Sequence, residues 1–313
     1  MEWYWYVLII TASTMISAVV SASFCIFEKV FRGNREKADE IIAEARKNPD
    51  PNVQMRVQTY DRMQEMPHDR LTLLSADGVR LSARYYPNGD SKNIAVTVHG
   101  WRSAPWWDYG GTFEMLYRNG YAVLAVSQRA LFESEGRYVT YGVREKEDIA
   151  GWIDLLLKRY GSDRNIALCG VSMGAATVLM ASGNALPEQV KCIVSDCSYT
   201  NAAALFRHTS KGWLPVSRLT VDLVVRARCG VSYFKADAVK AVMQSHTPTL
   251  FIHGDADEVV PYEMMGKLYA ACAAPKEQWT VSGAQHGEAY ATDPDGYAQR
   301  VLPFLARYMG SGK

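Results

Sequence analysis

The sequence lacks the residue patterns that bind zinc or nucleic acids. Its six cysteines never form a C-x-x-C pair and have no histidines grouped near them, which argues against a zinc site. Lys and Arg number 34 against 33 Asp and Glu, so the formal charge is only +1, and no basic run follows the first forty residues. We therefore expect no metal and no nucleic-acid partner.

The chain also has little need of disulfides. With 313 residues, 48% of them hydrophobic, it can bury a large core without covalent links. We interpret the cysteines as mostly buried free thiols, which favours a reducing compartment.

A long segment near the start of the chain carries no charge. Residues 3–27 carry no charged side chain and, as a helix, would exceed a hydrocarbon core of about 30 Å. The aromatic cluster at residues 3–6 suits a membrane interface. A cleaved signal peptide is the alternative, but Glu2 stands where that segment needs positive charge. We predict an uncleaved, single-pass anchor over residues 1–30.

The region after this span has two expected parts. Its basic residues all follow the span, so the positive-inside rule predicts a cytoplasmic location for the rest of the chain: Lys29, Arg32, Arg35 and Lys37. Residues 31–66 are polar and helix-favouring, with a break at residues 48–51, and we predict a juxtamembrane stalk. Residues 67–313 are expected to form one domain.

In that domain, strand and helix patterns alternate. Residues 71–74 and 79–86 flank Asp77-Gly78, which predicts a hairpin. Five buried strands are expected at 94–98, 122–126, 166–169, 192–194 and 249–252, with helices near 113–119, 144–160, 175–183 and 262–273. This order is typical of a mostly parallel sheet with helices on both faces. Residues from about 199 to 244 break the rhythm and are predicted to form a small helical lid.

The chemistry centres on Ser172. In Gly170-Val171-Ser172-Met173-Gly174 the two glycines permit a sharp turn from a strand into a helix, which holds the hydroxyl over the sheet edge. The helix N-terminus adds partial positive charge, and the N–H of Met173 points to where an oxyanion would form.

A serine nucleophile needs a histidine base and a carboxylate that orients it. His286 lies late in the chain, in a small-residue loop after the strand-like residues 278–281. Three acids follow the predicted strand at 249–252, namely Asp255, Asp257 and Glu258. We choose Asp257 as the triad acid.

At these motifs the chain resembles the α/β-hydrolase superfamily over about residues 70–309. It is most similar to lidded, often membrane-anchored bacterial serine hydrolases of the esterase or serine aminopeptidase-like kind. Their pattern H-G-x-x-D-x-x-V-P implies Asp257 as the triad acid. Their H-G-aromatic motif matches His99-Gly100-Trp101 and implies the backbone N–H of Trp101 as second oxyanion donor, with His99 structural. The resemblance implies no cofactor.

One motif departs from the family. Such enzymes usually have D-x-R-x-H-G-x-S-x-G, whereas this chain has Ser127-Gln128-Arg129 followed by Ala130-Leu131-Phe132 and Glu133-Ser134-Glu135-Gly136. Because the missing acid and histidine are not the triad, we expect an altered pocket shape and retained catalysis.

Apolar residues suggest the substrate. Trp106 and Trp107 follow the oxyanion loop, and the lid adds Phe206 and Trp213, so these four could wall an acyl pocket. They could equally pack the lid onto the body. We expect hydrolysis of small-molecule carboxylic esters with apolar acyl groups. Aminopeptidase-like cleavage, acyl transfer and a non-enzymatic scaffold stay open as alternatives, and the oligomeric state is undetermined.

Overall fold

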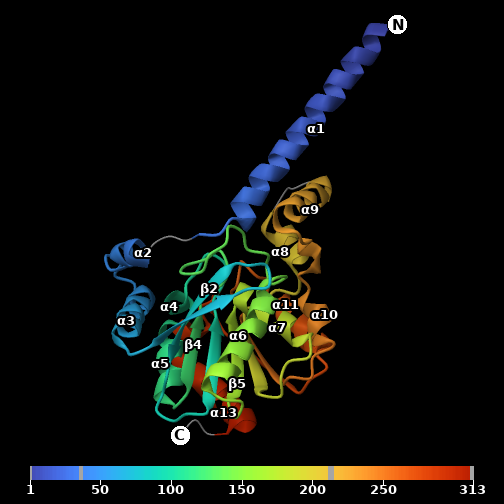
Figure 1. Cartoon of the computed structure of the whole chain (residues 1–313). Helices are drawn as coiled ribbons and strands as arrows, with labels where there is room; N and C mark the ends of the chain where they lie inside the picture. The colour runs from blue at the N-terminus through green and yellow to red at the C-terminus, as the bar shows by residue number, and fades with distance from the viewer. Residues whose placement is uncertain (1, 35–37, 211–214, 311–313) are drawn as a thin grey trace.

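A single β-sheet between two layers of helices forms the body of the protein, and one long helix projects from it (Figure 1). The computed structural model describes residues 2–34, 38–210 and 215–310. The strands are β1 (Asp69–Leu74), β2 (Arg80–Tyr86), β3 (Asn93–Val98), β4 (Ala122–Val126), β5 (Asn165–Val171), β6 (Val190–Asp196), β7 (Thr249–Gly254) and β8 (Lys276–Val281).

The sheet has the order β1-β2-β4-β3-β5-β6-β7-β8. β1 and β2 form the predicted antiparallel hairpin, with Asp69 opposite Tyr85 and Gly78 at φ 81° in the turn. β2 also pairs antiparallel with β4, and all later pairs are parallel. The prediction of a mostly parallel sheet is confirmed.

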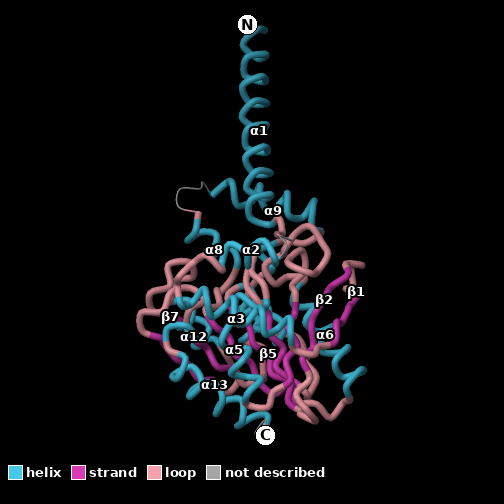
Figure 2. The backbone as a smooth tube through the Cα atoms, turned by 90° about the vertical axis from the view of Figure 1, so that its left-hand side faces the viewer, coloured by secondary structure: helices cyan, strands magenta, loops and turns pink. Residues whose placement is uncertain are grey.

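Helices cover both faces of the sheet (Figures 1 and 2). They are α1 (Glu2–Phe31), α2 (Ala38–Ala45), α3 (Pro51–Glu65), α4 (Pro105–Asp108), α5 (Gly110–Arg118), α6 (Glu145–Tyr160), α7 (Met173–Ser182), α8 (Ala202–Thr209), α9 (Pro215–Cys229), α10 (Ala238–Val242), α11 (Glu263–Ala271), α12 (Ala289–Thr292) and α13 (Pro294–Met309). A 3-10 turn, η1, spans Tyr233–Lys235.

Alternation along the strands divides the core in two. Ile94, Val96 and Val98 of β3 pack with α6, α7, α10 and α11 on one face. Ala95 points to the other face, where α3, α5 and α13 pack. This period-2 pattern is what a strand buried on both sides requires.

Helix α1 has an exposed part and a buried end. Residues 3–22 are all exposed, and these 20 residues span about 30 Å, the thickness of a hydrocarbon core. By length and composition this helix could cross a membrane, with a mean hydropathy of 2.0. Its end enters the body, because Phe27 and Phe31 are fully buried in the core.

The segment predicted as a stalk packs against the sheet layer. The hydroxyl of Thr59 in α3 donates to the carbonyl of Gly110 at 2.8 Å, and the hydroxyl of Tyr86 donates to the carbonyl of Met63 at 3.0 Å. Val57 and Met63 share one core cluster with α5 and α13. The division of the chain at residue 67 stays a prediction, and α3 shares its core with the strands beyond that point.

The predicted lid region has two different parts. Helices α8 and α9 lie at the end of the body where α1 leaves it, and α9 contacts α1 (Figures 1 and 2). Helix α10, by contrast, packs on α7 and α11 within the body. Among the described residues of 199–244, helices α8 and α9 and the η1 turn thus lie beside α1, whereas α10 does not.

A buried ion-pair network links β4 to the hairpin and to α6. Arg129 follows β4 and donates to both carboxylate oxygens of Asp148 at 2.7 Å and to Asp77 at 2.8 Å. Arg129 and Asp148 are only 5% and 6% exposed. Burial of these charges is compensated only by their pairing.

Replacing Arg129 by Ala should lower the free energy of unfolding by about 3–5 kcal/mol, because two carboxylates lose a buried partner. Urea unfolding of the full chain in detergent, followed by tryptophan fluorescence, measures this. The control is Arg70→Ala on an exposed position of β1, expected to change stability by less than about 0.5 kcal/mol. Equal unfolding of the two variants would contradict the role of the network.

Candidate active site

Ser172 sits on a strained turn between β5 and α7. Its φ of 56° and ψ of −117° are rare for a residue with a side chain. A Cβ added to Gly174 would lie 1.8 Å from the carbonyl oxygen of Val98, and one added to Gly170 would lie 2.5 Å from the Cα of Ala175. Both glycines are therefore required by close backbone contact, and the hydroxyl is held at the carboxyl edge of the sheet.

The structure brings Ser172, His286 and Asp257 together. His286 Nε2 lies 2.8 Å from the Oγ of Ser172, and its Nδ1 lies 2.7 Å from the Oδ2 of Asp257. The other oxygen of Asp257 accepts from the backbone N–H groups of Val259 and Val260 at 2.9 and 2.8 Å. The order of contacts is that of a nucleophile, a base and an orienting acid.

Asp257 is held ionised by its hydrogen bonds. Burial acts to raise the pKa of Asp257, but hydrogen bonds from His253 and His286 outweigh burial and hold that pKa well below its usual range. His253 is fully buried and its Nε2 lies 3.2 Å from the Oδ2 of Asp257. Sequence reasoning missed this histidine, although it is the first residue of the H-G-x-x-D pattern.

Two further residues missed by sequence reasoning lie behind the site. Asp196 ends β6 and is 4% exposed, and its Oδ1 has no hydrogen-bond partner among the described residues. Cys197 follows it, and its Sγ lies within 4.8 Å of ligand-type atoms of Asp257 and His286. Cys197, Asp257 and His286 are residue types that bind metal ions, but Asp257 and His286 are here hydrogen bonded to each other. The sequence offered one signal for Asp196 and Cys197. They stand at the carboxyl end of a strand, β6, that lies next to the strand leading to Ser172.

The loop after β3 lies against the serine. A Cβ added to Gly100 would be 3.2 Å from the Cβ of Ser172 and 3.6 Å from its Oγ. The N–H of Gly100 donates to Asp108 at 2.5 Å, and the hydroxyl of Ser103 donates to the same carboxylate at 2.5 Å. Asp108 thus orders the loop that carries Trp101. The oxyanion roles of the Trp101 and Met173 N–H groups stay predictions.

His99 is a structural residue of this loop, as its place in the sequence suggested. It is fully buried, and its Nε2 accepts from the backbone N–H of Gln128 at 3.0 Å. The side-chain amide of Gln128 donates to the carbonyl of His99. Burial lowers the pKa of His99, so the neutral ring is favoured. Gln128, from the departing motif, therefore holds the loop after β3 in place.

The same loop is hydrogen bonded to the end of α1. The indole N–H of Trp101 donates to the carbonyl of Val30 at 3.1 Å, and Arg102 donates to the carbonyls of Lys29 and Arg32 at 2.9 and 3.4 Å. The last carbonyls of a helix have no partner within the helix. Here Trp101 and Arg102 supply partners for the carbonyls of Val30 and Lys29, so the end of α1 and the loop after β3 are joined by hydrogen bonds.

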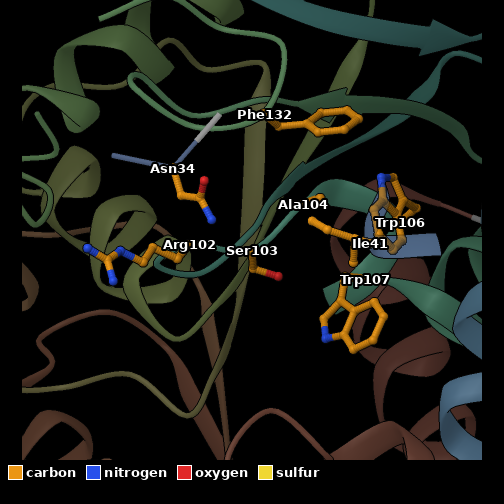
Figure 3. A pocket seen from close by; sticks show the side chains of 8 residues that line it. All are labelled: Asn34, Ile41, Arg102, Ser103, Ala104, Trp106, Trp107 and Phe132. Atoms are coloured by element: carbon orange, nitrogen blue, oxygen red, sulfur yellow. The ribbon is translucent and has the colours of Figure 1, made fainter. Parts of the chain in front are cut away.

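The predicted acyl-pocket residues do not form one pocket. Trp106 and Trp107 line a cavity beside the oxyanion loop, with the polar residues Asn34, Arg102 and Ser103 on one side and the apolar residues Ile41, Ala104, Trp106, Trp107 and Phe132 on the other (Figure 3). Phe206 lies elsewhere, packed on Phe31 and Tyr141, because α8 turns toward α1. Trp213 lies outside the described residues. Phe132, from the departing motif, takes a place in the wall.

Asp196→Asn should flatten the pH dependence of stability. Burial raises the pKa of Asp196 to about 7, with His253, His286 and Tyr297 acting against the shift. A folded-state pKa above the unfolded value gives stability that is present below about pH 4 and lost as pH rises through 7. The neutral variant lacks that loss, so its advantage should reach roughly 2–4 kcal/mol at pH 8.

Urea unfolding of both proteins between pH 5 and pH 8 measures this difference. Asp237→Asn, which changes the partly exposed N-cap carboxyl of α10, is the control and should keep the parent pH profile. If the free energies of unfolding of the parent and of Asp196→Asn change in parallel between pH 5 and pH 8, Asp196 is ionised in the folded state over that range.

Comparisons with known proteins find chains of similar sequence and fold. YqkD, an uncharacterized protein of Bacillus subtilis, is 22% identical over 308 residues, covering 95% of this chain and 96% of its own. YfhR, an uncharacterized protein of Escherichia coli K12, is 25% identical over 241 residues, covering 73% and 77%. A solved esterase of Pyrococcus furiosus has a TM-score of 0.68 and 22% identity, covering 90% of this chain and 98% of its own.

The likeness to the solved esterase confirms the predicted α/β-hydrolase fold. The model of the prolyl oligopeptidase family matches residues 107–312, which include Ser172, Asp257 and His286. The match spans more than half of the sequence. The chain therefore belongs to the prolyl oligopeptidase family of hydrolases.

Proposed function

We propose that this protein is a serine hydrolase that cleaves carboxylic esters with apolar acyl groups. The observation that carries the proposal is the continuous hydrogen-bonded series from Ser172 through His286 to Asp257. A serine hydroxyl becomes a useful nucleophile only with such a base in contact.

In the proposed mechanism, His286 takes the proton of Ser172 as the hydroxyl attacks the ester carbonyl. The N–H groups of Trp101 and Met173 stabilise the oxyanion, and ionised Asp257 orients the imidazole and stabilises its charge. The protonated His286 then gives its proton to the leaving alcohol. A water activated by His286 hydrolyses the acyl-enzyme and restores the serine.

The cavity beside the oxyanion loop supports an apolar substrate. Its volume is about 100 Å³, and its wall of Trp106, Trp107 and Phe132 suits a hydrocarbon group. Solved proteins of like fold include the esterase of Pyrococcus furiosus, which makes ester chemistry compatible with this sheet. These observations support a small apolar acyl group bound beside the loop that packs on Ser172.

The family match favours peptide hydrolysis as a second candidate. Members of the prolyl oligopeptidase family are described as peptidases by the family's name, and the same triad could attack an amide. Binding a peptide amino group needs a free carboxylate near the serine. Asp108 is close to Gly100, but it accepts from Gly100 and Ser103 and thereby orders the loop. We prefer ester cleavage, because the apolar wall and the cation Arg102 of the neighbouring cavity suit an acyl group better than an ammonium group.

We further propose that α1 is a single-pass membrane anchor with the hydrolase on the cytoplasmic side. The 20 exposed apolar-rich positions of α1 and the basic residues Lys29 and Arg32 after them support this arrangement. It places the α8–α9 end of the body next to the bilayer, where lipid-derived esters are concentrated.

Ser172→Ala should abolish hydrolysis of p-nitrophenyl esters, with kcat falling by at least about 10⁴-fold, because the nucleophile is lost. The assay uses a series of acyl lengths together with aminoacyl-naphthylamides. Fluorophosphonate labelling should occur on the parent and fail on the variant. The control is Ser210→Ala, which changes a lid serine outside the triad. It should keep both ester hydrolysis and fluorophosphonate labelling.

Full esterase activity in Ser172→Ala would end the proposal of a serine mechanism. Release of naphthylamine without ester cleavage would favour the peptidase candidate.

Arg102→Ala should lower kcat on the order of tenfold with little change in KM, because loss of the bond to α1 lets the oxyanion loop shift. Arg102→Lys should recover part of the rate, since one donor is kept. Arg228→Ala is the control. Arg228 of α9 lies over the ring of Phe24 in α1, and it has no contact with the Trp101–Arg102 loop among the interactions of the described residues. A lower Tm with unchanged kcat would assign Arg102 a purely structural role.

A further inference from the structure

A second cavity lies where α1 meets the α8–α9 lid, apart from the one beside the oxyanion loop. Its volume is about 240 Å³, and its lining comes from α1, α8, α9 and the η1 turn: Ile26, Lys29, Val30, Phe31, Phe206, Thr209, Ser210, Arg218, Val221 and Tyr233. None of these residues belongs to the proposed triad or to the Trp106–Trp107 wall. The space exceeds that of several water molecules, at roughly 30 Å³ each.

The lining of this cavity is mostly apolar and carries positive charge. Phe31, Phe206, Tyr233 and Val221 offer aromatic and aliphatic surface, whereas the two charged residues in the lining, Lys29 and Arg218, are both cations. Among the described lining residues there is no acid. Such a site suits an amphiphile that has a hydrocarbon chain and an anionic head.

The position of the cavity matches a membrane surface. The uniformly exposed part of α1 ends at residue 22, one turn before the first lining residue, Ile26. On α9, Leu219 and Leu223 are 65% and 64% exposed, one turn apart on one face of the helix. Figures 1 and 2 both show α9 beside the base of α1. Exposed leucines there are unfavourable in water and favourable in lipid.

The walls of the cavity are fixed by contacts on both sides. The ring of Phe31 packs on those of Phe206 and Tyr233, with centroids 5.6 and 5.9 Å apart. Ser23 of α1 and Thr220 of α9 share a hydrogen bond of 2.6 Å. The N–H of Val139 donates to the carbonyl of Phe31 at 2.8 Å. The cavity is therefore pre-formed, which reduces the entropy lost on binding.

We propose that this cavity is an accessory site for the acyl chain of an anionic amphiphile drawn from the membrane, with the head group contacting Lys29 and Arg218. The ligand is either an anionic phospholipid or a free fatty acid, which share this chemistry. The inference rests on the proposed membrane anchoring and is independent of catalysis by Ser172.

The test uses the full chain as Ser172→Ala, so that no bound ester can be cleaved. Photoreactive phosphatidylglycerol, phosphatidylcholine and palmitic acid, each with a diazirine in the acyl chain, are mixed with the protein in nanodiscs of unlabelled phosphatidylcholine. Peptide mass spectrometry locates the crosslinks. We expect crosslinks on Phe31, Phe206 or Val221, with phosphatidylglycerol or palmitic acid at least fivefold stronger than phosphatidylcholine.

Matched variants separate the cavity from the surrounding lipid. Val221→Trp fills the space and should reduce crosslinking at Phe31 and Phe206 at least tenfold. Leu223→Trp, on the exposed face of the same helix, should leave it unchanged. Arg218→Glu places a negative charge at the site and should weaken only the anionic probes. Thermal unfolding of each variant checks that it is folded.

The outcomes decide between sources and against the proposal. Strong labelling by phosphatidylglycerol assigns the site to a membrane phospholipid, and labelling by palmitic acid alone assigns it to a free fatty acid. The proposal is overturned if Val221→Trp is labelled as strongly as the protein with Val221. It is also overturned if the three probes label equally strongly, both with Arg218 present and in Arg218→Glu. Because every protein carries Ser172→Ala, these results do not depend on whether the enzyme cleaves esters.

Discussion

The turn at Ser172 is the constraint on which the arrangement of the other site residues depends. Serine is held at a positive φ because α7 approaches β3 so closely that Gly174 touches the carbonyl of Val98. The N–H of Ser172 also donates to the carbonyl of Asp196 at 2.9 Å, so three neighbouring strands hold the strained residue. Because parallel strands end at the same edge, the loops after β7 and β8 deliver Asp257 and His286 to that point.

The parts of the site that obey local rules could be predicted from the sequence. The glycines around Ser172 and the Asp77-Gly78 turn are backbone requirements confined to a few residues, and the structure has the turn in each place. The contact of His253 with Asp257 and the burial of Asp196 could not be predicted in this way. The first depends on how the loop after β7 folds back onto the end of that strand. The second depends on β6 lying between β5 and β7, and strand order is not encoded in any local pattern.

The pocket was harder to predict because apolar character does not identify a partner. Trp106 and Phe206 are both large and apolar, but Trp106 packs on Tyr60 and Trp107, whereas Phe206 packs on Phe31. Hydropathy and charge likewise predicted a membrane anchor over residues 1–30. They could not show that Phe31 continues the same helix into the core.

The two buried carboxylates of the site have opposite environments. Asp257 receives hydrogen bonds from two histidines and two backbone N–H groups, whereas Asp196 keeps one oxygen without a partner among the described residues. Environment thus sets the pKa of one below its usual range and raises that of the other to about 7. Of these two carboxylates, Asp257 is the one hydrogen bonded to His286, at 2.7 Å, so it is the group placed to orient the imidazole.

The end of helix α1 is hydrogen bonded to the loop that packs on Ser172. The carbonyl of Val30 accepts from the indole of Trp101 and from the hydroxyl of Tyr141, at 3.1 and 3.2 Å. Trp101 adjoins Gly100, whose Cα lies against Ser172. The side chains of Trp101 and Arg102 thus bridge the end of α1 and the loop that packs on Ser172. A shift of α1 relative to the body would break these hydrogen bonds, whereas the contacts among Ser172, His286 and Asp257 do not involve α1.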